Sequence, residues 1–193
     1  MLKAEYKRIV ECDKARYNGV NVTFFRKVKN PALSYTLALR KVQYLKGKRF
    51  RKISLAIAKW KLFRLSVKYG YQIGHDAKIG KGLYLGHYGT IVVNGACKIG
   101  DNVNIAVGVT LGQENRGKRK GTPTILNNVF IGANSVVVGN ITVGNNVLIA
   151  PLTLVNFDVP DNSIVIGNPA KIIPCENATE GYINFVLKEE ENV

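Results

Sequence analysis

The sequence predicts a mainly β protein whose central part is a parallel β-helix, preceded by an N-terminal α-helical region. An aliphatic residue returns every six positions between residues 73 and 155, whereas the first third of the chain has apolar residues at helical spacing. Charge divides at the same place, because residues 1–71 are strongly basic and the remainder is nearly neutral. We therefore expect a basic, largely helical region over residues 1–71, a β-helix domain over residues 72–173 and a C-terminal tail over residues 174–193.

The six-residue repeat is the main reason to expect a β-helix. Six is a multiple of two, so the same side chain points inward on every short strand, and a helix with 3.6 residues per turn does not match this period. A β-sandwich, whose strands recur about every 8–12 residues, fits less well. Three hexads make one triangular turn, which predicts four to five stacked turns with a common core. The repeat positions are Ile73, Ile79, Leu85, Ile91, Ile99, Ile105, Leu111, Ile125, Ile131, Val137, Val143, Ile149 and Val155.

Two steps of the repeat are longer than six. The step from Ile91 to Ile99 is eight, which places two extra residues in that hexad, and the step from Leu111 to Ile125 is fourteen, which predicts an inserted loop. Paired Asp and Asn residues fall between the strands, and Asn tolerates the left-handed backbone that a sharp corner requires. The expected corners are Asp101-Asn102, Asn127-Asn128 and Asn145-Asn146.

The N-terminal region is expected to contain two helices, over residues 32–45 and 50–67, interrupted at Gly47 and ended at Gly70. Residues 40–68 carry eleven Lys and Arg and no acidic residue. Three explanations stay open: docking on anionic lipid at the inner membrane face, capping of the open β-helix end by the apolar face, and nucleic-acid binding, for which no motif is recognised. The apolar face of the second helix consists of Phe50, Ile53, Ile57, Trp60, Phe63 and Val67.

Composition excludes several other classes of protein. The net charge is +15, with 19 cationic and 3 acidic residues in residues 1–71. Cys12, Cys97 and Cys175 are scattered and form no CxxC motif, so free thiols are expected, and two histidines are too few for a zinc site. The chain start lacks an apolar signal core, and no apolar stretch approaches the roughly 20 residues that cross a bilayer. We expect a cytoplasmic protein without a metal, with peripheral membrane contact as an option.

Residues 72–173 contain a set of short glycine-rich motifs. They are Ala77-Lys78-Ile79-Gly80-Lys81-Gly82, Gly86-His87-Tyr88-Gly89-Thr90-Ile91-Val92-Val93, Val109-Thr110-Leu111-Gly112, Ile131-Gly132-Ala133, Val138-Gly139-Asn140-Ile141-Thr142-Val143-Gly144 and Gly167-Asn168-Pro169-Ala170-Lys171. As a set, these motifs resemble those of the hexapeptide-repeat acyltransferases, and within them the serine acetyltransferase branch. The resemblance implies a left-handed parallel β-helix, a homotrimer and acetyl-CoA bound in the groove between neighbouring β-helices.

The resemblance places the catalytic histidine at His87. An alcohol needs a base to remove its proton as its oxygen attacks a thioester. Neutral imidazole, with a pKa of about 6.5, can accept that proton at cytoplasmic pH. A positioned base supplies about 10²–10⁴-fold in rate, and a backbone N–H is the usual donor to the developing oxyanion. No Ser or Cys lies in a nucleophile motif, so we expect direct transfer without an acyl-enzyme. The alternative for His87 is a solvated corner residue, and His75 is interpreted as a turn residue.

The same resemblance suggests residues that bind the acetyl-CoA. Lys171 matches the family residue near the nucleotide end, and Gly112 and Ala133 match small residues beside the pantetheine arm. The alternative for Gly112 and Ala133 is plain β-helix construction. The loop over residues 113–122 carries Arg116 and Lys118 and matches the family loop over the active-site mouth, so contact with an anionic substrate and a merely solvated loop are both open.

Three departures from the serine acetyltransferase pattern shape the expected acceptor. Gln72 stands where an aspartate orients the histidine, Gly86 replaces a second aspartate, and Lys120-Gly121-Thr122 replaces an Asp-Arg-His stretch. An uncharged acceptor leaves no buried charge without a partner. We therefore expect a sugar or polysaccharide hydroxyl as acceptor, as in the capsule and polysaccharide O-acetyltransferases. The alternatives are serine O-acetyltransferase activity of cysteine biosynthesis and a non-catalytic membrane-associated scaffold.

Overall fold

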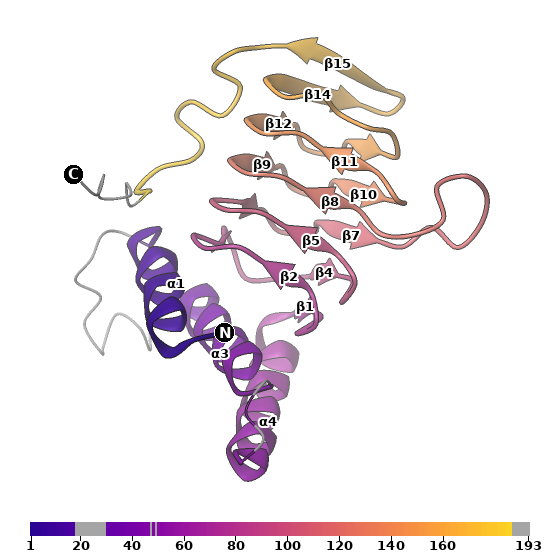
Figure 1. The fold of residues 1–193 in the computed structure, drawn as a ribbon. Helices are drawn as coiled ribbons and strands as arrows, with labels where there is room; N and C mark the ends of the chain where they lie inside the picture. Colours follow the sequence, from indigo (N-terminus) through magenta and orange to yellow (C-terminus); the bar gives the residue numbers. More distant parts are fainter. Residues whose placement is uncertain (18–29, 47, 49, 187–193) are drawn as a thin grey trace.

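The computed structural model describes residues 1–17, 30–46, 48 and 50–186, and it contains three helices followed by a tall stack of short strands (Figure 1). The predicted parallel β-helix with an N-terminal helical region is confirmed. Three parallel sheets form the sides of the stack. The first contains five strands, which mark five successive turns in agreement with the repeat. None of the described helices is long and apolar enough to cross a membrane.

Each sheet takes one strand from successive turns. The first sheet contains β1 (Tyr71–Ile73), β4 (Ile91–Val93), β7 (Thr110–Gly112), β10 (Val136–Val138) and β13 (Leu154–Val155). The second contains β2 (Lys78–Ile79), β5 (Lys98–Ile99), β8 (Thr124–Ile125) and β11 (Thr142–Val143). The third contains β3 (Tyr84–Leu85), β6 (Asn104–Ile105), β9 (Val129–Ile131), β12 (Val147–Ile149), β14 (Ser163–Gly167) and β15 (Ala170–Pro174), of which only β15 is antiparallel to its neighbour.

The aliphatic repeat builds the core because repeat residues of successive turns stand beside each other. In the second sheet, for example, Ile79, Ile99, Ile125 and Val143 are consecutive partners. In the first sheet, however, Ile73 pairs with Val93 rather than with Ile91. The two extra residues therefore lie between Leu85 and Val93, and the predicted position between Ile91 and Ile99 is wrong.

The predicted asparagine corners are confirmed. Asn102, Asn128 and Asn146 have φ values of 56°, 55° and 52°, in the left-handed region that Asn tolerates better than most residues. The amide of Asn102 donates to the side chain of Asn128 at 3.2 Å, one turn further along the stack. The corners are thus linked to each other as well as to the strands.

The helices are α1 (Lys3–Ala15), α3 (Pro31–Lys46) and α4 (Lys52–Tyr69), so both predicted helices are present. Gly70 ends α4 with φ 80°, as predicted, whereas Gly47 lies outside the described residues. The apolar face of α3 is almost completely buried, and Tyr35 packs its ring 4.8 Å from that of Tyr71 in β1. Helix α3 therefore lies against the first turn of the β-helix and caps it.

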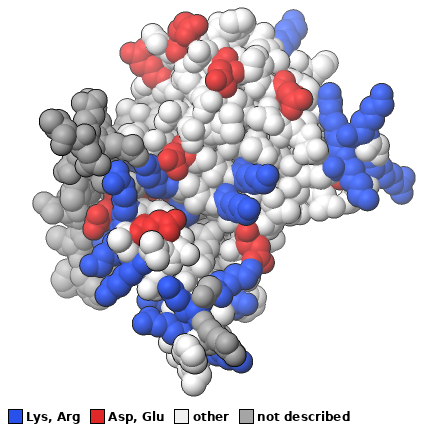
Figure 2. All heavy atoms as spheres, in the orientation of Figure 1, with Lys and Arg blue, Asp and Glu red and all other residues white. Residues whose placement is uncertain are grey.

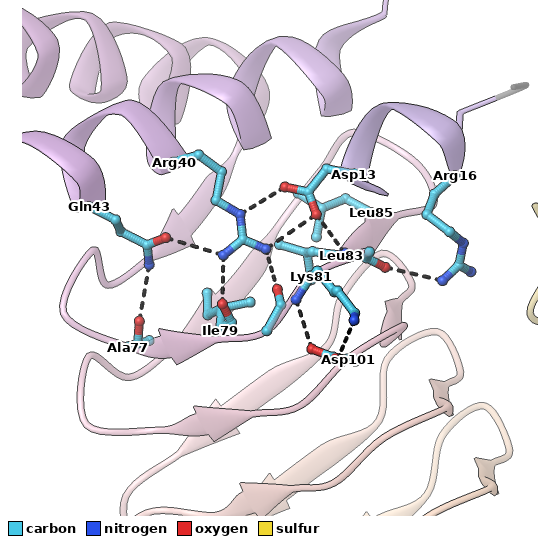
Figure 3. A network of polar contacts seen from close by, with 12 residues as sticks. Asp13, Arg16, Arg40, Gln43, Ala77, Ile79, Lys81, Leu83, Leu85 and Asp101 are labelled. Carbon is cyan, nitrogen blue, oxygen red and sulfur yellow. Dashed lines mark hydrogen bonds and ion pairs between the residues drawn. The ribbon is translucent and has the colours of Figure 1, made fainter. Parts of the chain in front are cut away.

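A buried polar network attaches α1 and α3 to the first turn (Figure 3). The guanidinium of Arg40 lies 2.8 Å from the carboxylate of Asp13, and both side chains are fully buried. Arg40 also donates to the carbonyls of Ile79 (2.7 Å) and Gly80, and Asp13 accepts a hydrogen bond from the amide of Leu83 at 2.9 Å. Arg40 thus neutralises Asp13 and satisfies these carbonyls, so this cation of the basic N-terminal region is buried and paired rather than solvated.

The outer face of α4 does not cap the β-helix. Its apolar residues, from Ile53 to Val67, are exposed, as is Phe50 just before the helix, while Ala58 and Leu62 form the buried side of the helix. The capping explanation therefore holds for α3 and fails for the predicted apolar face of α4.

The described part of the C-terminal tail is packed against the protein. Tyr182 packs 4.7 Å from the ring of Phe130, and the Asn104 amide donates to the Tyr182 carbonyl at 2.8 Å. The Arg16 guanidinium donates to the Asn184 carbonyl at 2.7 Å, so the tail joins the third sheet to α1. The acidic run at residues 189–191 lies outside the described residues.

Candidate active site

His87 lies in the turn between β3 and β4, at the corner that contains the two extra residues. Its side chain is exposed, while two hydrogen bonds fix the main chain of the turn. The hydroxyl of Tyr71 donates to the His87 carbonyl at 3.2 Å, and the amide of Gly89 donates to the Tyr69 carbonyl at 2.9 Å. The corner thus presents the imidazole on the outer surface and fixes its backbone to the end of α4.

Glycine is required at position 89 for two reasons. Its φ is 142°, which side-chain-bearing residues rarely adopt, and a Cβ atom there would lie 2.7 Å from Cγ2 of Val107 on the next turn. The space beside Val107 therefore admits only a residue without a side chain at this point of the corner. His87 was recognised from its motif, whereas Tyr71 and Gly89 were not singled out, although the eight-residue step after Ile91 was a signal for an unusual corner.

Gln72 is exposed on β1 and pairs in register with Val92. Among the described residues, no hydrogen bond reaches the His87 imidazole, either from Gln72 or from another side chain. Gln72 lines a cavity of about 470 Å³ between α4 and the first turn, together with Phe63 and His75. The orienting hydrogen bond that the resemblance implies at this position is therefore absent among the described residues.

His75 lies in the turn between β1 and β2, whereas His87 lies in the turn between β3 and β4. Its Nδ1 is buried and 3.5 Å from Oδ2 of Asp76, without a hydrogen bond among the described residues. Burial lowers the pKa of His75, and the cations of Lys59 and Lys46 lower it further. Asp76 forms an ion pair with Lys46 and, among the described residues, no hydrogen bond to His87.

The candidate cofactor residues follow the outside of the stack. Gly112 ends β7, where a Cβ atom would lie 3.0 Å from Val138, and Ala133 follows β9 at a half-buried corner. Lys171 is exposed on β15, at the opposite edge of the third sheet from β3, which leads to His87. Five strand spacings of about 4.8 Å place the two edges roughly 24 Å apart, so these residues could only contact the two ends of an elongated ligand.

The loop over residues 113–122 projects from the β-helix beside β7 and β8, and Figure 2 shows its cationic side chains gathered on the right of the molecule. Its base is closed by two hydrogen bonds between Glu114 and Gly121, both 2.9 Å. Arg119 donates to the carbonyl of Asn156, which anchors the tip, whereas Arg116 and Lys118 are exposed. Among the described residues, no hydrogen bond or ion pair joins this loop to His87.

Comparisons with known proteins identify the family. The model for the bacterial transferase hexapeptide (six repeats) matches residues 122–156. A serine acetyltransferase of Helicobacter pylori is 34% identical over 175 residues, covering 90% of this chain and 98% of that protein. Serine acetyltransferases of Bacillus pumilus and Staphylococcus epidermidis match over 48% and 53% of their length, so the chain spans about half of these relatives.

Solved structures extend the similarity to the helices. Neisseria gonorrhoeae serine acetyltransferase, in complex with serine, has a TM-score of 0.70 and 31% identity, covering 89% of this chain and 70% of that chain. A serine acetyltransferase in complex with CoA has a TM-score of 0.67 and 28% identity, with the same two coverages.

The expectation of a sugar or polysaccharide acceptor is contradicted by these relatives. It depended on the departures at Gln72, Gly86 and Thr122. A short helical region occurs in the family, because the H. pylori serine acetyltransferase is matched over nearly its full length. A missing charge at one position does not exclude an amino acid substrate either, since a charged group from another position can take its place. The similarity to capsule and polysaccharide O-acetyltransferases is not supported.

At 34% identity over almost the whole of the H. pylori serine acetyltransferase, the chain belongs to the serine acetyltransferase family of hexapeptide-repeat acyltransferases.

Proposed function

We propose that this protein is a serine O-acetyltransferase, which moves the acetyl group of acetyl-CoA to the hydroxyl of L-serine. The observation that carries the proposal is the match to the H. pylori serine acetyltransferase over 98% of that protein. The structural neighbours support the two substrates, because one was solved with serine and another with CoA. The helices of this chain are included in that similarity, which covers 89% of its length.

His87 is proposed as the general base. Its imidazole accepts the proton of the serine hydroxyl while the oxygen attacks the thioester carbonyl, and a tetrahedral intermediate forms. When the intermediate collapses, the C–S bond breaks, and the imidazolium returns the proton to the CoA thiolate. The exposed side chain and the firmly held backbone of the corner support this role, because a base must be both accessible and positioned.

A single chain supplies only part of such a site, so we propose that the protein works as a homotrimer with acetyl-CoA between neighbouring β-helices. Gly112 and Ala133 would line the pantetheine arm and Lys171 would approach the nucleotide phosphates. Gln72 would contact a substrate or the histidine of a neighbouring copy, since it is exposed on β1 and free to face outward.

The charge that a serine carboxylate needs is proposed to come from the loop over residues 113–122. Arg116 and Lys118 are exposed cations on an arm whose base is closed and whose tip is anchored by Arg119. They would replace the cationic residues that the family carries at the positions of Gly121 and Thr122. A charge-assisted hydrogen bond from guanidinium to carboxylate suits this task.

The test is acetyl-CoA consumption with L-serine, with O-acetylserine identified by mass spectrometry. We expect turnover with L-serine, little with D-serine, and a loss of at least about 100-fold in His87→Gln. Sedimentation of His87→Gln should match that of the wild type, which keeps the loss of activity separate from a loss of folding. Wild-type protein that binds acetyl-CoA but never acetylates serine would refute the proposed acceptor, and an active His87→Gln would remove His87 from its role.

A further inference from the structure

Helix α4 carries an exposed apolar stripe on the side that faces away from the protein. Successive helical residues are about 100° apart, which puts Trp60 nearly opposite the buried Ala58 and Leu62. A helix that is apolar on both sides is normally buried on both, so the outer side lacks a partner in the single chain. The stripe, called here the α4 stripe, consists of Ile53, Ile57, Trp60, Phe63 and Val67 on the helix and Phe50 just before it, which are between 62% and 96% exposed. Phe63 lies at the edge of the stripe, where it also lines the cavity beside Gln72.

Cations border the α4 stripe on both sides. Lys52 and Lys59 lie along one edge and Lys61 and Lys68 along the other, all exposed, and Arg64 emerges within the stripe beside Trp60 with its guanidinium 5.5 Å from the ring centroid. The sequence has no acidic residue between Asp13 and Asp76. Figure 2 shows the resulting concentration of Lys and Arg over the helical end of the molecule, while the acidic side chains gather mainly over the β-helix.

We propose that the α4 stripe docks the protein on an anionic lipid surface, with the apolar side chains in the headgroup boundary and the cations against the lipid phosphates. Trp and Phe in the apolar part and Lys and Arg at its edges are the composition of an interfacial helix. Each cation adds attraction to an anionic leaflet. Arg64 can extend its charge out of the stripe along its aliphatic stem.

Charge favours this partner over a second copy of the chain. Pairing α4 with α4 would bring together two or three sets of like charges, and it would bury Arg64 without a carboxylate partner from either helix. Figure 1 shows α4 projecting beyond the first turn, at the end opposite β15, so it can meet a surface without the β-helix intervening. Docking would be peripheral, because none of the described helices could span a bilayer.

The experiment is flotation of the full-length protein with phosphatidylcholine vesicles, with and without phosphatidylglycerol. We expect flotation only with the anionic vesicles and weaker binding at high salt. Ile57→Ser with Trp60→Ser should reduce partitioning at least about tenfold, and so should Lys52→Gln with Lys61→Gln and Arg64→Gln. The matched control removes three cations elsewhere, with Arg116→Gln, Lys118→Gln and Lys120→Gln, and should float like the wild type. Circular dichroism verifies that each variant is folded.

Several results would overturn the proposal. These are equal flotation with neutral vesicles, no flotation with either kind, or the same loss in the loop control as in the α4 charge variant. Sedimentation velocity tests whether a second copy of the chain covers the stripe instead. A smaller assembly in Ile57→Ser with Trp60→Ser would assign the stripe to contacts between copies. Tighter binding to an RNA oligonucleotide than to anionic vesicles would assign it to nucleic acid. None of these readouts depends on serine acetylation, so the outcome is separate from that of the proposed function.

Discussion

The hydroxyl of Tyr71 donates a hydrogen bond to the main-chain carbonyl of His87, with 3.2 Å between the two oxygens. Tyr71 is completely buried and packs against Tyr35, so the donor is fixed by the interface between α3 and the first strand. Burial raises the pKa of Tyr71, and the neighbouring Tyr35 raises it further, so the hydroxyl keeps its proton and remains a donor. The capping helix therefore holds the corner that carries the proposed base.

Tyr71→Phe is expected to lower kcat severalfold, because the loss of one hydrogen bond lets the His87 corner shift while the ring packing is retained. The free energy of unfolding should fall by about 0.5–1.5 kcal/mol, the usual net value of one hydrogen bond. Steady-state kinetics and urea unfolding measure the two effects.

Tyr17→Phe is the matched control. The Tyr17 hydroxyl is also buried, but it accepts a hydrogen bond from the Leu85 amide at 2.9 Å and makes no contact with the His87 backbone. This variant should lose stability with kcat retained. An equal fall of kcat in both variants would show that the Tyr71–His87 contact has no special part in activity.

The repeat predicted the fold because each aliphatic position has the same environment on every turn. It misplaced the two extra residues because Ile91 and Val93 both point inward along one strand, two residues apart. A period-two pattern cannot tell which of them continues the series, and only pairing with Ile73 decides it. His87 was therefore recognised from its motif, whereas the enlargement of its corner was not predicted.

The helices illustrate a second limit. Both sides of α4 are apolar, so the pattern alone could not tell whether Ala58 and Leu62 or Ile57 and Trp60 face the protein; packing against α3 and β1 decides it. The buried pair of Asp13 and Arg40 was also beyond sequence reasoning. Two oppositely charged residues 27 positions apart on different helices carry no local signal of contact.

Arg40→Met is expected to destabilise the protein by about 3–5 kcal/mol, because it leaves the carboxylate of Asp13 buried without its cation. Two main-chain carbonyls on the first turn lose their donor at the same time. Asp13→Asn with Arg40→Met should cost less than the sum of the single changes, since no charge then remains buried.

Lys46→Met provides the control for that measurement. The Lys46–Asp76 pair is about half exposed, so its loss should change the free energy of unfolding by less than about 1 kcal/mol. Urea unfolding of the wild type, Arg40→Met, Asp13→Asn, the double variant and Lys46→Met gives the comparison. Similar effects of Arg40→Met and Lys46→Met would contradict the buried network.

The pKa shift of His75 predicts a pH dependence of stability. Because burial, Lys59 and Lys46 lower its pKa in the folded state, the unfolded chain binds more protons when the solution is mildly acidic. This part of the stability is complete above the unfolded pKa of about 6.5 and is lost as pH falls toward the lower folded value.

His75→Gln should therefore flatten the fall of Tm between about pH 7 and pH 5. Lys59→Gln keeps the histidine and removes one cause of the shift, so it should flatten the same curve to a smaller extent. Differential scanning calorimetry at several pH values makes the comparison. Curves of the same slope for the wild type and His75→Gln would exclude His75 as a source of acid sensitivity.

The last prediction separates the two anionic groups that the loop could contact. If Arg116 and Lys118 hold the carboxylate of serine, Arg116→Gln with Lys118→Gln should raise KM for serine about tenfold, the value of a lost charge-assisted hydrogen bond, and leave KM for acetyl-CoA nearly unchanged. The opposite pattern would assign the two cations to the CoA phosphates. Arg119→Gln is the structural control, because Arg119 anchors the loop on Asn156 and should change both KM values together. A double variant with both KM values unchanged would leave the loop as solvated surface, and the cation for the serine carboxylate would then have to come from a neighbouring copy of the chain.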